Sequence, residues 1–316
     1  MVKGGTNMAS KQNLAPKDNA ADEITYLRPV SNCSGCGDTK VSWSVREGMR
    51  RFNRQLKLKG KDRYELIYAA DRGCGNLQGY HAYGIVDAIF CMGTGAIVGD
   101  GIKESCSEKQ IVVTASGDGA YNFNISGIKF AAKNKKFGAI NVIYNNYNIR
   151  MTGGQIPLEV DFDKEGPAFG FEVIHINPYR VNDNAELFKE LYRRYLNKEK
   201  IMVVADGVCV LDMGKIAKDS GIRMGHFIRS NECLDLKFAK ERARVAREEP
   251  EKLKDLPKFK CRLCGIGLRC HALLDNDPGK CFGCGACSQF PCPVGALSFE
   301  GPSFSTSISM TELKKT

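Results

Sequence analysis

No segment of this sequence has the features of a membrane-spanning or secreted protein. None of the apolar runs in its 316 residues approaches the length needed to cross a membrane as a helix. The polar stretch 1–27 lacks the hydrophobic segment of a secretory signal, so we expect it to be a flexible arm. Disulfide scaffolds are usually short and secreted, so the 14 cysteines favour metal-binding thiolates over disulfides. We therefore expect a cytoplasmic protein that does not bind a membrane.

Signals for nucleic-acid and dinucleotide binding are also absent. The 46 Lys and Arg exceed the 36 Asp and Glu, for a formal charge of +10, but they are spread along the chain without interleaved aromatic residues. Two glycine clusters, GCGNLQG and GTGAIVG, do not have the G-x-G-x-x-G spacing of a dinucleotide loop, and there is no P-loop. Because bound metal–thiolate groups and phosphates would offset the positive charge, we expect no nucleic-acid partner.

Helical and β-rich stretches alternate between about 39 and 230. TKVSWSVREGMRRFNRQL and NAELFKELYRRYLNK have the amphipathic pattern of helices, whereas IVVTAS, AINVIYNN and IMVVADGV are β-rich. This alternation predicts an α/β fold with a doubly wound, mostly parallel sheet that is covered on both faces. The expected parts are a flexible arm (1–27), the α/β domain (28–240), a charged linker helix (241–257), a small cysteine-rich module (258–300) and a tail (301–316).

A candidate site for a metal and a diphosphate follows two of the expected strands. Gly117 and Gly119 flank Asp118 directly after IVVTAS, and AINVIYNN ends at Asn146 one crossover later. The carboxyl ends of parallel strands lie at one edge of a sheet, so we expect Asp118 and Asn146 to be neighbours. A helix expected to begin near residue 124 would point its N-terminus at this site, and an ordinary turn is the alternative. The predicted Mg²⁺ ligands are the side chains of Asp118 and Asn146 and the main-chain carbonyl of Asn148.

The stretch from GDG through NNYNIRMTGGQ resembles the thiamine-diphosphate-binding, β-type subunit of the 2-oxoacid:ferredoxin oxidoreductases, the family of the pyruvate and indolepyruvate oxidoreductases. GDG followed by NN after 25 residues is the thiamine diphosphate motif, and the family places TGGQ or a close variant (here 152–155) just after the metal-binding strand. CMGTGAIVGDGIK is similar to the family's stretch that opens a helix beside the cofactor, with close helix packing as the alternative for Gly93 and Thr94. The implied cofactor contacts are Gly75, Gly93, Thr94, Gly117, Asp118, Gly119, Asn146 and Thr152.

Three cysteines in the first quarter of the chain form a candidate iron–sulfur site. Cys33 and Cys36 have C-x-x-C spacing, and Cys74 stands in a glycine-rich loop after YELIYAA. A C-x-x-C alone could be redox-active or bind zinc, but together with Cys74 it resembles the family's cluster site on the thiamine domain. We expect Cys233 as the fourth ligand and Cys209 as the second choice, because a lone cysteine in an apolar run usually packs. Cys91 and Cys106 are expected only to pack.

The cysteine-rich module contains seven cysteines, one fewer than two four-cysteine clusters need. CFGCGACSQFPCP has the C-x2-C-x2-C…C-P form of a ferredoxin half-site, and zinc sites rarely have this pattern. In the preceding CRLCGIGLRC, Gly267 stands where a third cysteine would be. In two-cluster ferredoxins the fourth cysteine of each run binds the other cluster. That rule groups Cys270 with Cys281, Cys284 and Cys287.

The remaining cysteines of the module leave alternatives open. Cys261, Cys264 and Cys292 could hold a three-iron cluster, or a four-iron cluster completed by His271. A single cluster with Cys292 as its fourth ligand is the simpler alternative, with the upstream cysteines vestigial or zinc-binding. We favour two clusters slightly.

The resemblance implies a thiamine-dependent enzyme that oxidatively decarboxylates or cleaves a 2-oxoacid. Electrons would pass through [4Fe-4S] clusters, first the one near Cys74 and then the C-terminal module, to an external ferredoxin. The chain has no second α/β domain, so an α-type subunit with the pyrimidine-binding domain and a γ-type subunit are implied as partners. Coenzyme A is the usual acyl acceptor in the family, and no catalytic residue is assigned on this chain. A non-oxidative thiamine decarboxylase or ligase, or an electron-transfer subunit without thiamine, are the alternatives.

Overall fold

The computed structural model describes residues 32–305 apart from 34, 80–85, 124, 220, 222, 257–269, 271 and 274–275. The predicted arm 1–27 therefore lies outside the described residues. So do Cys261, Cys264, Gly267 and His271 of the cysteine-rich module. Within the described ranges, no helix is long and apolar enough to cross a membrane.

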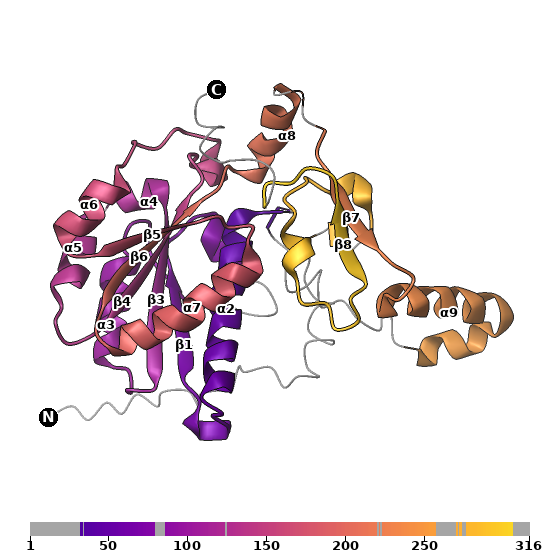
Figure 1. Ribbon diagram of the computed structural model, residues 1–316, viewed down its shortest axis with the longest axis horizontal. Coiled ribbons are helices and arrows are strands. Elements are labelled where there is room, and N and C mark those ends of the chain that lie inside the picture. The colour runs from indigo at the N-terminus through magenta and orange to yellow at the C-terminus, as the bar shows by residue number, and fades with distance from the viewer. Residues whose placement is uncertain are drawn as a thin grey trace, which may run out of the picture.

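Six parallel strands form the main sheet, in the order β2-β1-β3-β4-β6-β5 (Figure 1). The apolar runs in the sequence become strands because both faces of a parallel sheet are buried. All seven residues of β4, for example, are buried. The predicted α/β fold with a mostly parallel sheet is confirmed. The strands are β1 (Glu65–Ala70), β2 (Ala88–Ile89), β3 (Gln110–Gly117), β4 (Ala139–Asn145), β5 (Glu172–Ile176) and β6 (Lys200–Asp206).

Helices α2 (Gly37–Gln55) and α7 (Val181–Leu196) cover one face of the sheet. The apolar residues of α2 recur at three- and four-residue intervals, so Val41, Val45 and Phe52 share a buried face. The two helices are joined by a hydrogen bond from the Ser44 hydroxyl to the carbonyl of Val181, at 3.0 Å. This packing fixes the start of α2, and with it the residues that precede α2.

The opposite face of the sheet is covered by α3 (Gly95–Glu104), α4 (Asp118–Phe123), α5 (Ile125–Lys133) and α6 (Phe162–Phe169). Alternate residues of β4 separate the two core layers, since Ile140 faces α7 and Ile143 faces α4–α6. The sequence predicts one helix from about residue 124, but the structure has two. The first of them, α4, begins at Asp118 itself.

The C-terminal part of the chain packs beside the sheet as a smaller unit. Strands β7 (His226–Arg229) and β8 (Leu297–Glu300) pair antiparallel, and α8 (Val210–Asp219) connects β6 to them. The unit is attached through Asn177, whose side-chain amide donates to the carbonyl of Phe304 at 2.9 Å. The unit also contains three short 3₁₀ helices: Pro250–Asp255, Pro278–Lys280 and Ala286–Gln289.

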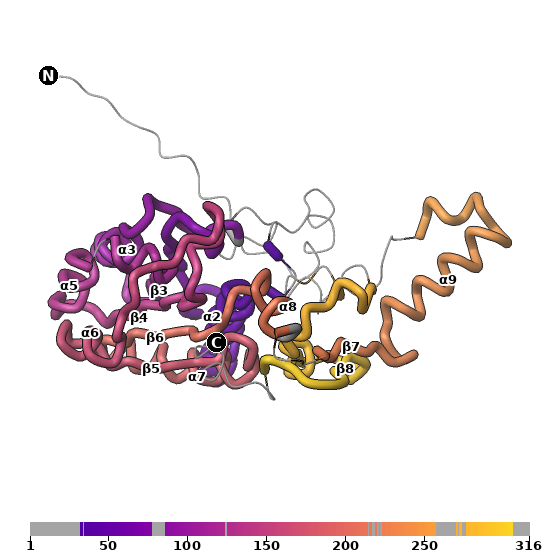
Figure 2. The backbone as a smooth tube through the Cα atoms, turned by 90° about the horizontal axis from the view of Figure 1, so that it is seen from above, coloured from indigo at the N-terminus to yellow at the C-terminus, as the bar shows by residue number. Residues whose placement is uncertain are grey.

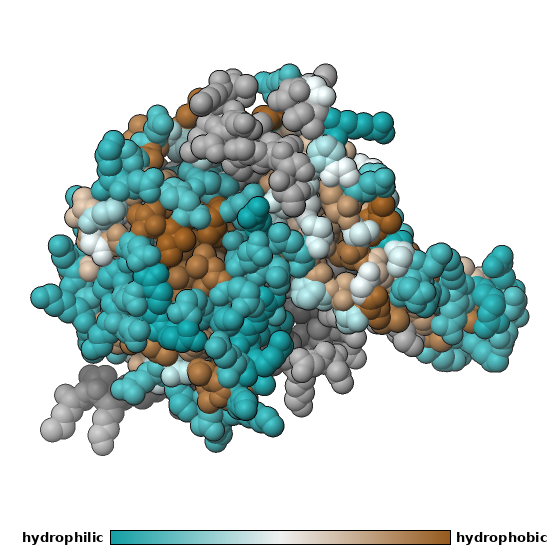
Figure 3. Space-filling model, viewed as in Figure 1, coloured by the Kyte–Doolittle hydropathy of each residue, from teal (hydrophilic) through white to brown (hydrophobic). Residues whose placement is uncertain are grey.

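Helix α9 (Leu234–Glu248) projects away from the rest of the molecule (Figure 2). It is the predicted charged linker, and its surface is mostly hydrophilic (Figure 3). Only Phe238 and Val245 of this helix are buried. Because α9 begins at Leu234, the predicted domain boundary at residue 240 falls inside the helix. The pairing of β7 with β8 also joins segments on either side of that predicted linker.

Candidate functional site

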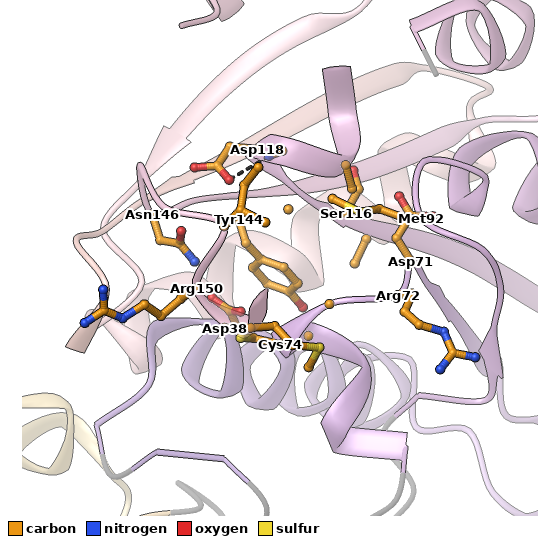
Figure 4. Close-up of a pocket in the computed structure, with 18 of the residues that line it drawn as sticks. Asp38, Asp71, Arg72, Cys74, Met92, Ser116, Asp118, Tyr144, Asn146 and Arg150 are labelled. Carbon is orange, nitrogen blue, oxygen red and sulfur yellow. Dashed lines mark hydrogen bonds between the residues drawn. The ribbon is translucent and has the colours of Figure 1, made fainter. Parts of the chain in front are cut away.

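A pocket opens at the carboxyl ends of β1, β3 and β4 (Figure 4). The strand register explains its position, since Gly117 of β3 pairs with Tyr144 of β4 and the residues after both strands reach the same edge. Five predicted cofactor contacts, including both predicted metal-binding side chains, lie in its wall: Gly75, Gly117, Asp118, Gly119 and Asn146. Asn148 lines it as well. Its other polar and charged residues include Asp38, Asp71, Arg72, Cys74, Ser116 and Arg150.

Asp118 is the buried carboxylate of this pocket, with 4% of its surface exposed. One oxygen, Oδ1, accepts a hydrogen bond from the main-chain N–H of Gly119 at 2.7 Å. The N–H groups of residues 146–148 also point toward the carboxylate, but burial outweighs them and raises its pKa. The other oxygen, Oδ2, is buried without a hydrogen-bond partner among the described residues. A buried carboxylate oxygen of this kind fits a bound cation.

The loop after β4 supplies further oxygen atoms. The side-chain oxygen of Asn146 accepts from the N–H of Asn148 at 3.1 Å. The amide nitrogen of Asn148 donates to Asp212 Oδ2 at 2.8 Å, which leaves its Oδ1 buried without a partner in the described structure. The main-chain carbonyl of Asn148 accepts from Arg150 at 3.0 Å. Asn148 therefore has two oxygens that could serve a metal, and the prediction considered only the carbonyl.

Sequence reasoning missed the residues that support this loop. Tyr147 has a left-handed backbone with φ 59°, and its hydroxyl donates to Asp206 Oδ1 at 2.9 Å. Asp206 Oδ1 also accepts from Asn145 at 2.6 Å, and Oδ2 pairs with His175 Nδ1 at 2.5 Å. Burial would raise the pKa of Asp206, but these three hydrogen bonds together lower it. Asp206 ends β6, which pairs with β4, so its side chain reaches the same edge of the sheet as Asn145. Its place at the end of the β-rich run IMVVADGV is the signal that could have pointed to it.

Three glycines shape the pocket because they have no side chain. A Cβ atom on Gly75 would lie 2.7 Å from the Tyr144 ring, and one on Gly119 would lie 2.6 Å from Ile149 Cγ1. A Cβ on Gly117 would meet no protein atom within 4 Å. Gly75 and Gly119 are therefore needed for close packing, whereas Gly117 leaves space open beside Asp118, as a phosphate requires.

Three other predicted cofactor contacts do not line the pocket. The N–H groups of Gly93, Thr94 and Gly95 point instead to the carboxylate of Asp71, which accepts from Gly95 at 2.5 Å. Burial nevertheless raises the pKa of Asp71 to about 6. The side chain of Thr152 donates to Gln155 within the TGGQ loop, at 2.7 Å. Gly93 and Thr94 thus hold the start of α3 behind the pocket wall, which is the helix-packing alternative.

Asp38 is a second buried carboxyl group in the pocket, and the sequence reasoning did not select it. It lies in the first turn of α2, directly after the C-x-x-C motif. Burial and then the negative charge of Asp118 raise its pKa to about 7, although the Asn146 side chain hydrogen-bonds to it. Figure 4 shows Asp38 near Cys74 at the side of the pocket opposite Asp118. An acidic residue next to two predicted metal-binding cysteines is the signal that could have revealed it.

Four cysteines form what we call the proximal cysteine group, and one of them also lines the pocket. The pKa of Cys74 is affected electrostatically by both Cys209 and Cys33, and that of Cys36 by Cys74. The group is therefore Cys33, Cys36, Cys74 and Cys209.

Of the two candidates for the fourth ligand, the structure places Cys209, the second choice, with the other three cysteines. Cys209 accepts hydrogen bonds at its carbonyl from the first turn of α8, so it lies at the start of that helix and not inside a strand. Cys233, the first choice, precedes α9, and no interaction in the described structure links it to the group. Cys91, which was expected to pack, is exposed.

Three of the proximal cysteines, Cys36, Cys74 and Cys209, are partly buried, whereas Cys33 is exposed. Burial raises the pKa of Cys36 and Cys209, and that of Cys74 to about 12. Main-chain N–H groups point at these three sulfurs and lower each pKa: Thr39 at Cys36, Met151 at Cys74 and Leu211 at Cys209. Such N–H groups stabilise a thiolate sulfur, and positive metal charge would supply the remainder.

The distal cysteine group comprises Cys270, Cys281, Cys284 and Cys287, the four that the ferredoxin rule places together. Burial raises the pKa of Cys284 to about 11, and the charges of Cys270 and Cys281 contribute. Gly283 N–H points at Cys281 Sγ from 3.5 Å. Cys292 has no described interaction with this group, which favours Cys270 over it as the fourth member.

Within the described ranges, no three His, Cys, Asp or Glu side chains lie close enough to bind one metal ion.

A comparison with family models matches residues 73–205 to "Thiamine pyrophosphate enzyme, C-terminal TPP binding domain". The matched range contains Asp118, Asn146 and most of the pocket, whereas the distal cysteine group lies outside it. No curated protein matches the sequence.

Solved structures to which the chain is similar include a 2-oxoglutarate:ferredoxin oxidoreductase from Magnetococcus marinus, which was solved with 2-oxoglutarate, coenzyme A and succinyl-CoA bound. It is 17% identical, with a TM-score of 0.45, over 73% of this chain and 94% of that chain. A transketolase from Leishmania mexicana is 14% identical, with a TM-score of 0.30, over 54% of this chain and 35% of that chain.

Proposed function

We propose that the chain is the thiamine-binding subunit of a 2-oxoacid:ferredoxin oxidoreductase, a proposal supported by the match of residues 73–205 to a thiamine-pyrophosphate-binding domain. One observation supports the proposal that the reaction is an oxidation. Cys74 belongs to the proximal cysteine group and also lines the pocket beside Asp38 and Gly75. An iron–sulfur cluster at that position could take electrons directly from the cofactor site. A non-oxidative thiamine enzyme has no use for one there.

Magnesium and the diphosphate would be held at the Asp118 side of the pocket. Asp118 Oδ2 and Asn148 Oδ1 are buried oxygens without described partners, and Asn146 lines the same wall. Thiamine diphosphate, when bound, supplies the electron sink for decarboxylating a 2-oxoacid. The open space at Gly117 would leave room for the diphosphate.

Asp38 and Arg150 are two of the ionisable pocket residues that this chain could direct at a substrate or cofactor. Asp38 has a pKa of about 7, so it can hold or release a proton inside the pocket near neutral pH. Arg150 lines the pocket and is ion-paired to Asp212 at 3.2 Å, which fixes its guanidinium at the rim. An arginine at a rim favours the carboxylate of an entering 2-oxoacid.

Electrons would leave through the distal cysteine group to an external ferredoxin. Gly35 lies between Cys33 and Cys36, and a Cβ atom on it would lie 3.6 Å from Cys284 Sγ. The loop of the proximal group therefore touches a cysteine of the distal group. Electron transfer between clusters requires such closeness, and this contact supports a path from the pocket through the proximal group to the distal one.

The proposal includes partner subunits. The described residues form one α/β core, whereas thiamine enzymes of this kind bind the cofactor between two domains, so an α-type subunit with the pyrimidine-binding domain would close the pocket. Exposed apolar residues near the pocket support a docking face there: Phe123 is 69% exposed, Ile156 91% and Leu158 74%. The N–H₂ of Asn122 donates to the carbonyl of Leu158 at 3.2 Å, so this loop lies along α4. A γ-type subunit and coenzyme A as acyl acceptor belong to the same proposal.

The test is a comparison of wild type and Cys74→Ser in the assembled complex under anaerobic conditions. We expect iron and acid-labile sulfide in the wild type, with 2-oxoacid-dependent reduction of ferredoxin. Cys74→Ser should lose the iron of one cluster and the ferredoxin reduction while it still binds thiamine diphosphate. A wild-type complex without iron that releases an aldehyde would instead identify a non-oxidative decarboxylase.

A further inference from the structure

The side chains of the loop after β4 alternate between the pocket and the protein behind it. Asn146 and Asn148 line the pocket, and Asn146 lies on the same side of it as Asp118 (Figure 4). Asn145 and Tyr147 do not line the pocket. Successive side chains of an extended chain point to opposite faces, and Asn145 is the last residue of β4. The loop therefore has one pair of side chains for the pocket and another pair for contacts behind it.

The carboxylate of Asp206 binds both of the side chains that are directed away from the pocket. Its Oδ1 accepts from Asn145 Nδ2 at 2.6 Å and from the Tyr147 hydroxyl at 2.9 Å. The main chain makes the same connection, since Asn145 pairs with Asp206 in the sheet and its carbonyl accepts from the N–H of Gly207 at 3.1 Å. Asp206 itself does not line the pocket. One carboxylate outside the pocket therefore fixes the residues on both sides of Asn146.

His175 of β5 holds the other oxygen of this carboxylate. Its Nδ1 lies 2.5 Å from Asp206 Oδ2, and its Nε2 lies 3.2 Å from Oδ1 of Asp163 on α6. Both oxygens of Asp206 thus have described partners. On the pocket side, Asp118 Oδ2 and Asn148 Oδ1 have none among the described residues. The loop is therefore anchored on the side away from the pocket, and the oxygens without described partners are on the pocket side.

Tyr147 requires such an anchor because its backbone is left-handed, with φ 59°. Residues other than glycine rarely adopt this conformation, and a tyrosine ring cannot make the local hydrogen bond that Asn or Asp makes there. The turn at Tyr147 brings the N–H of Asn148 within 3.1 Å of the side-chain oxygen of Asn146. A different backbone conformation at Tyr147 would move both neighbours. The hydrogen bond from Tyr147 to Asp206 therefore determines where the two pocket-lining asparagines lie.

We propose that Asp206 is a positioning residue for Mg²⁺, although it lies outside the pocket lining. By holding Asn145 and Tyr147, Asp206 keeps the two asparagines beside them in place to bind the metal together with Asp118. This inference rests on one part of the proposed function, the binding of thiamine diphosphate with Mg²⁺, and it does not depend on iron–sulfur clusters. Loss of a residue that orients metal ligands from behind typically weakens metal binding about 10- to 100-fold.

The experiment measures thiamine diphosphate binding to the assembled complex by isothermal titration calorimetry over a series of Mg²⁺ concentrations. Tyr147→Phe removes one hydrogen bond to Asp206 and keeps the ring. Asp206→Ala removes both hydrogen bonds to the loop, whereas Asp206→Asn keeps an oxygen that can accept from Asn145 and Tyr147. Tyr121→Phe is the matched control, because the Tyr121 hydroxyl also donates to a carboxylate, Glu165 Oε2 at 3.1 Å, and does not line the pocket.

We expect Asp206→Ala to raise the Mg²⁺ concentration for half-maximal cofactor binding by about 10- to 100-fold. The rise should be smaller for Tyr147→Phe, and Asp206→Asn and Tyr121→Phe should stay close to wild type. At saturating Mg²⁺ every variant should bind the cofactor as tightly as wild type, because only the metal affinity is changed. Asp206→Ala combined with Tyr147→Phe should be no weaker than Asp206→Ala alone, since both substitutions remove the same contact.

An unchanged Mg²⁺ dependence in Asp206→Ala or in Tyr147→Phe would overturn the inference. A loss of cofactor binding that saturating Mg²⁺ does not restore would also overturn it, because that result shows a general disruption of the pocket. If Asp206→Ala does not assemble, the Mg²⁺ dependence of Tyr147→Phe against Tyr121→Phe decides in the same way. A wild-type complex that binds no thiamine diphosphate would refute the proposed function itself, and that result is obtained before any variant is compared.

Discussion

Asp212 of α8 contacts the loop after β4, which contains the proposed metal ligands Asn146 and Asn148, and its N–H donates to the carbonyl of Cys209. Its removal should therefore weaken the proposed cofactor binding from outside the pocket. Its Oδ2 accepts from Asn148 Nδ2 at 2.8 Å, and its Oδ1 pairs with Arg150 at 3.2 Å. A carboxylate can only accept, so it fixes the Asn148 amide with its nitrogen outward and its buried oxygen free for a metal. Asp212 itself is not in the pocket lining.

The expected size of this effect follows from the two contacts. A hydrogen bond to a charged group contributes about 1.5–3 kcal/mol, and a partly exposed ion pair contributes about 0.2–1 kcal/mol. If about 2 kcal/mol of the energy of these two contacts holds the loop in its binding conformation, Asp212→Ala should weaken thiamine diphosphate binding roughly 30-fold in the presence of Mg²⁺. Asp212→Asn loses the ion pair but keeps an acceptor for Asn148, so it should weaken binding only a few-fold.

Isothermal titration calorimetry of thiamine diphosphate into the assembled complex measures this directly, at saturating and at limiting Mg²⁺. Asp219→Ala is the control, because Asp219 is an exposed carboxylate on the same helix. The iron content should stay at the wild-type level in all three variants, since Cys209 is retained. An Asp212→Ala complex that binds the cofactor as tightly as wild type would refute the role of Asp212 in orienting Asn148.

Three further predictions test separate parts of the site. Cys209→Ser should lower the iron content of the proximal group while Cys233→Ser does not, and iron analysis with the reverse outcome would restore Cys233 as the fourth ligand. Gly119→Ala should lower the melting temperature, because its Cβ would lie 2.6 Å from Ile149 and overpacking of this kind destabilises by about 1–3 kcal/mol. Gly117→Ala should leave the melting temperature unchanged but weaken cofactor binding, and equal effects of the two substitutions would contradict this assignment. The hydrogen bond to Asp206 raises the pKa of His175. The His175–Asp206 pair therefore stabilises the fold fully below about pH 6.5, and this stabilisation is lost as the pH rises through the raised pKa of His175. Asp206 has a lowered pKa, so it stays ionised except in acid. In thermal melts, the stability advantage of wild type over His175→Asn should therefore shrink as the pH rises through the raised pKa of His175. A difference that is constant with pH would argue against the pair.

The sheet and the main pocket could be predicted because local patterns determine them. The apolar runs of β3 and β4 become neighbouring buried strands, and parallel strands bring Asp118 and Asn146 to one edge without any further information. The distal group also followed from a spacing rule, which places Cys270 with the three closely spaced cysteines.

The rest depends on packing between segments that are far apart in the sequence. Cys209 follows an apolar strand, so the sequence favours a packing role. Only the turn into α8 brings Cys209 to Cys74. Asp38 and Asp206 are single polar residues within ordinary elements, and their roles come from the groups that the fold places beside them. Gly93 and Thr94 belong to the stretch CMGTGAIVGDGIK, which resembles one beside the cofactor in the family. In this structure, however, their N–H groups point to the carboxylate of Asp71.

The central claim is that electrons from a 2-oxoacid leave the thiamine site through the proximal cysteine group. Electron paramagnetic resonance of the anaerobic assembled complex, frozen after addition of a 2-oxoacid such as pyruvate, tests it most directly. We predict the signal of reduced iron–sulfur clusters, dependent on thiamine diphosphate and Mg²⁺, and absent in Cys74→Ser. Clusters that stay oxidised while the 2-oxoacid is consumed would contradict the claim.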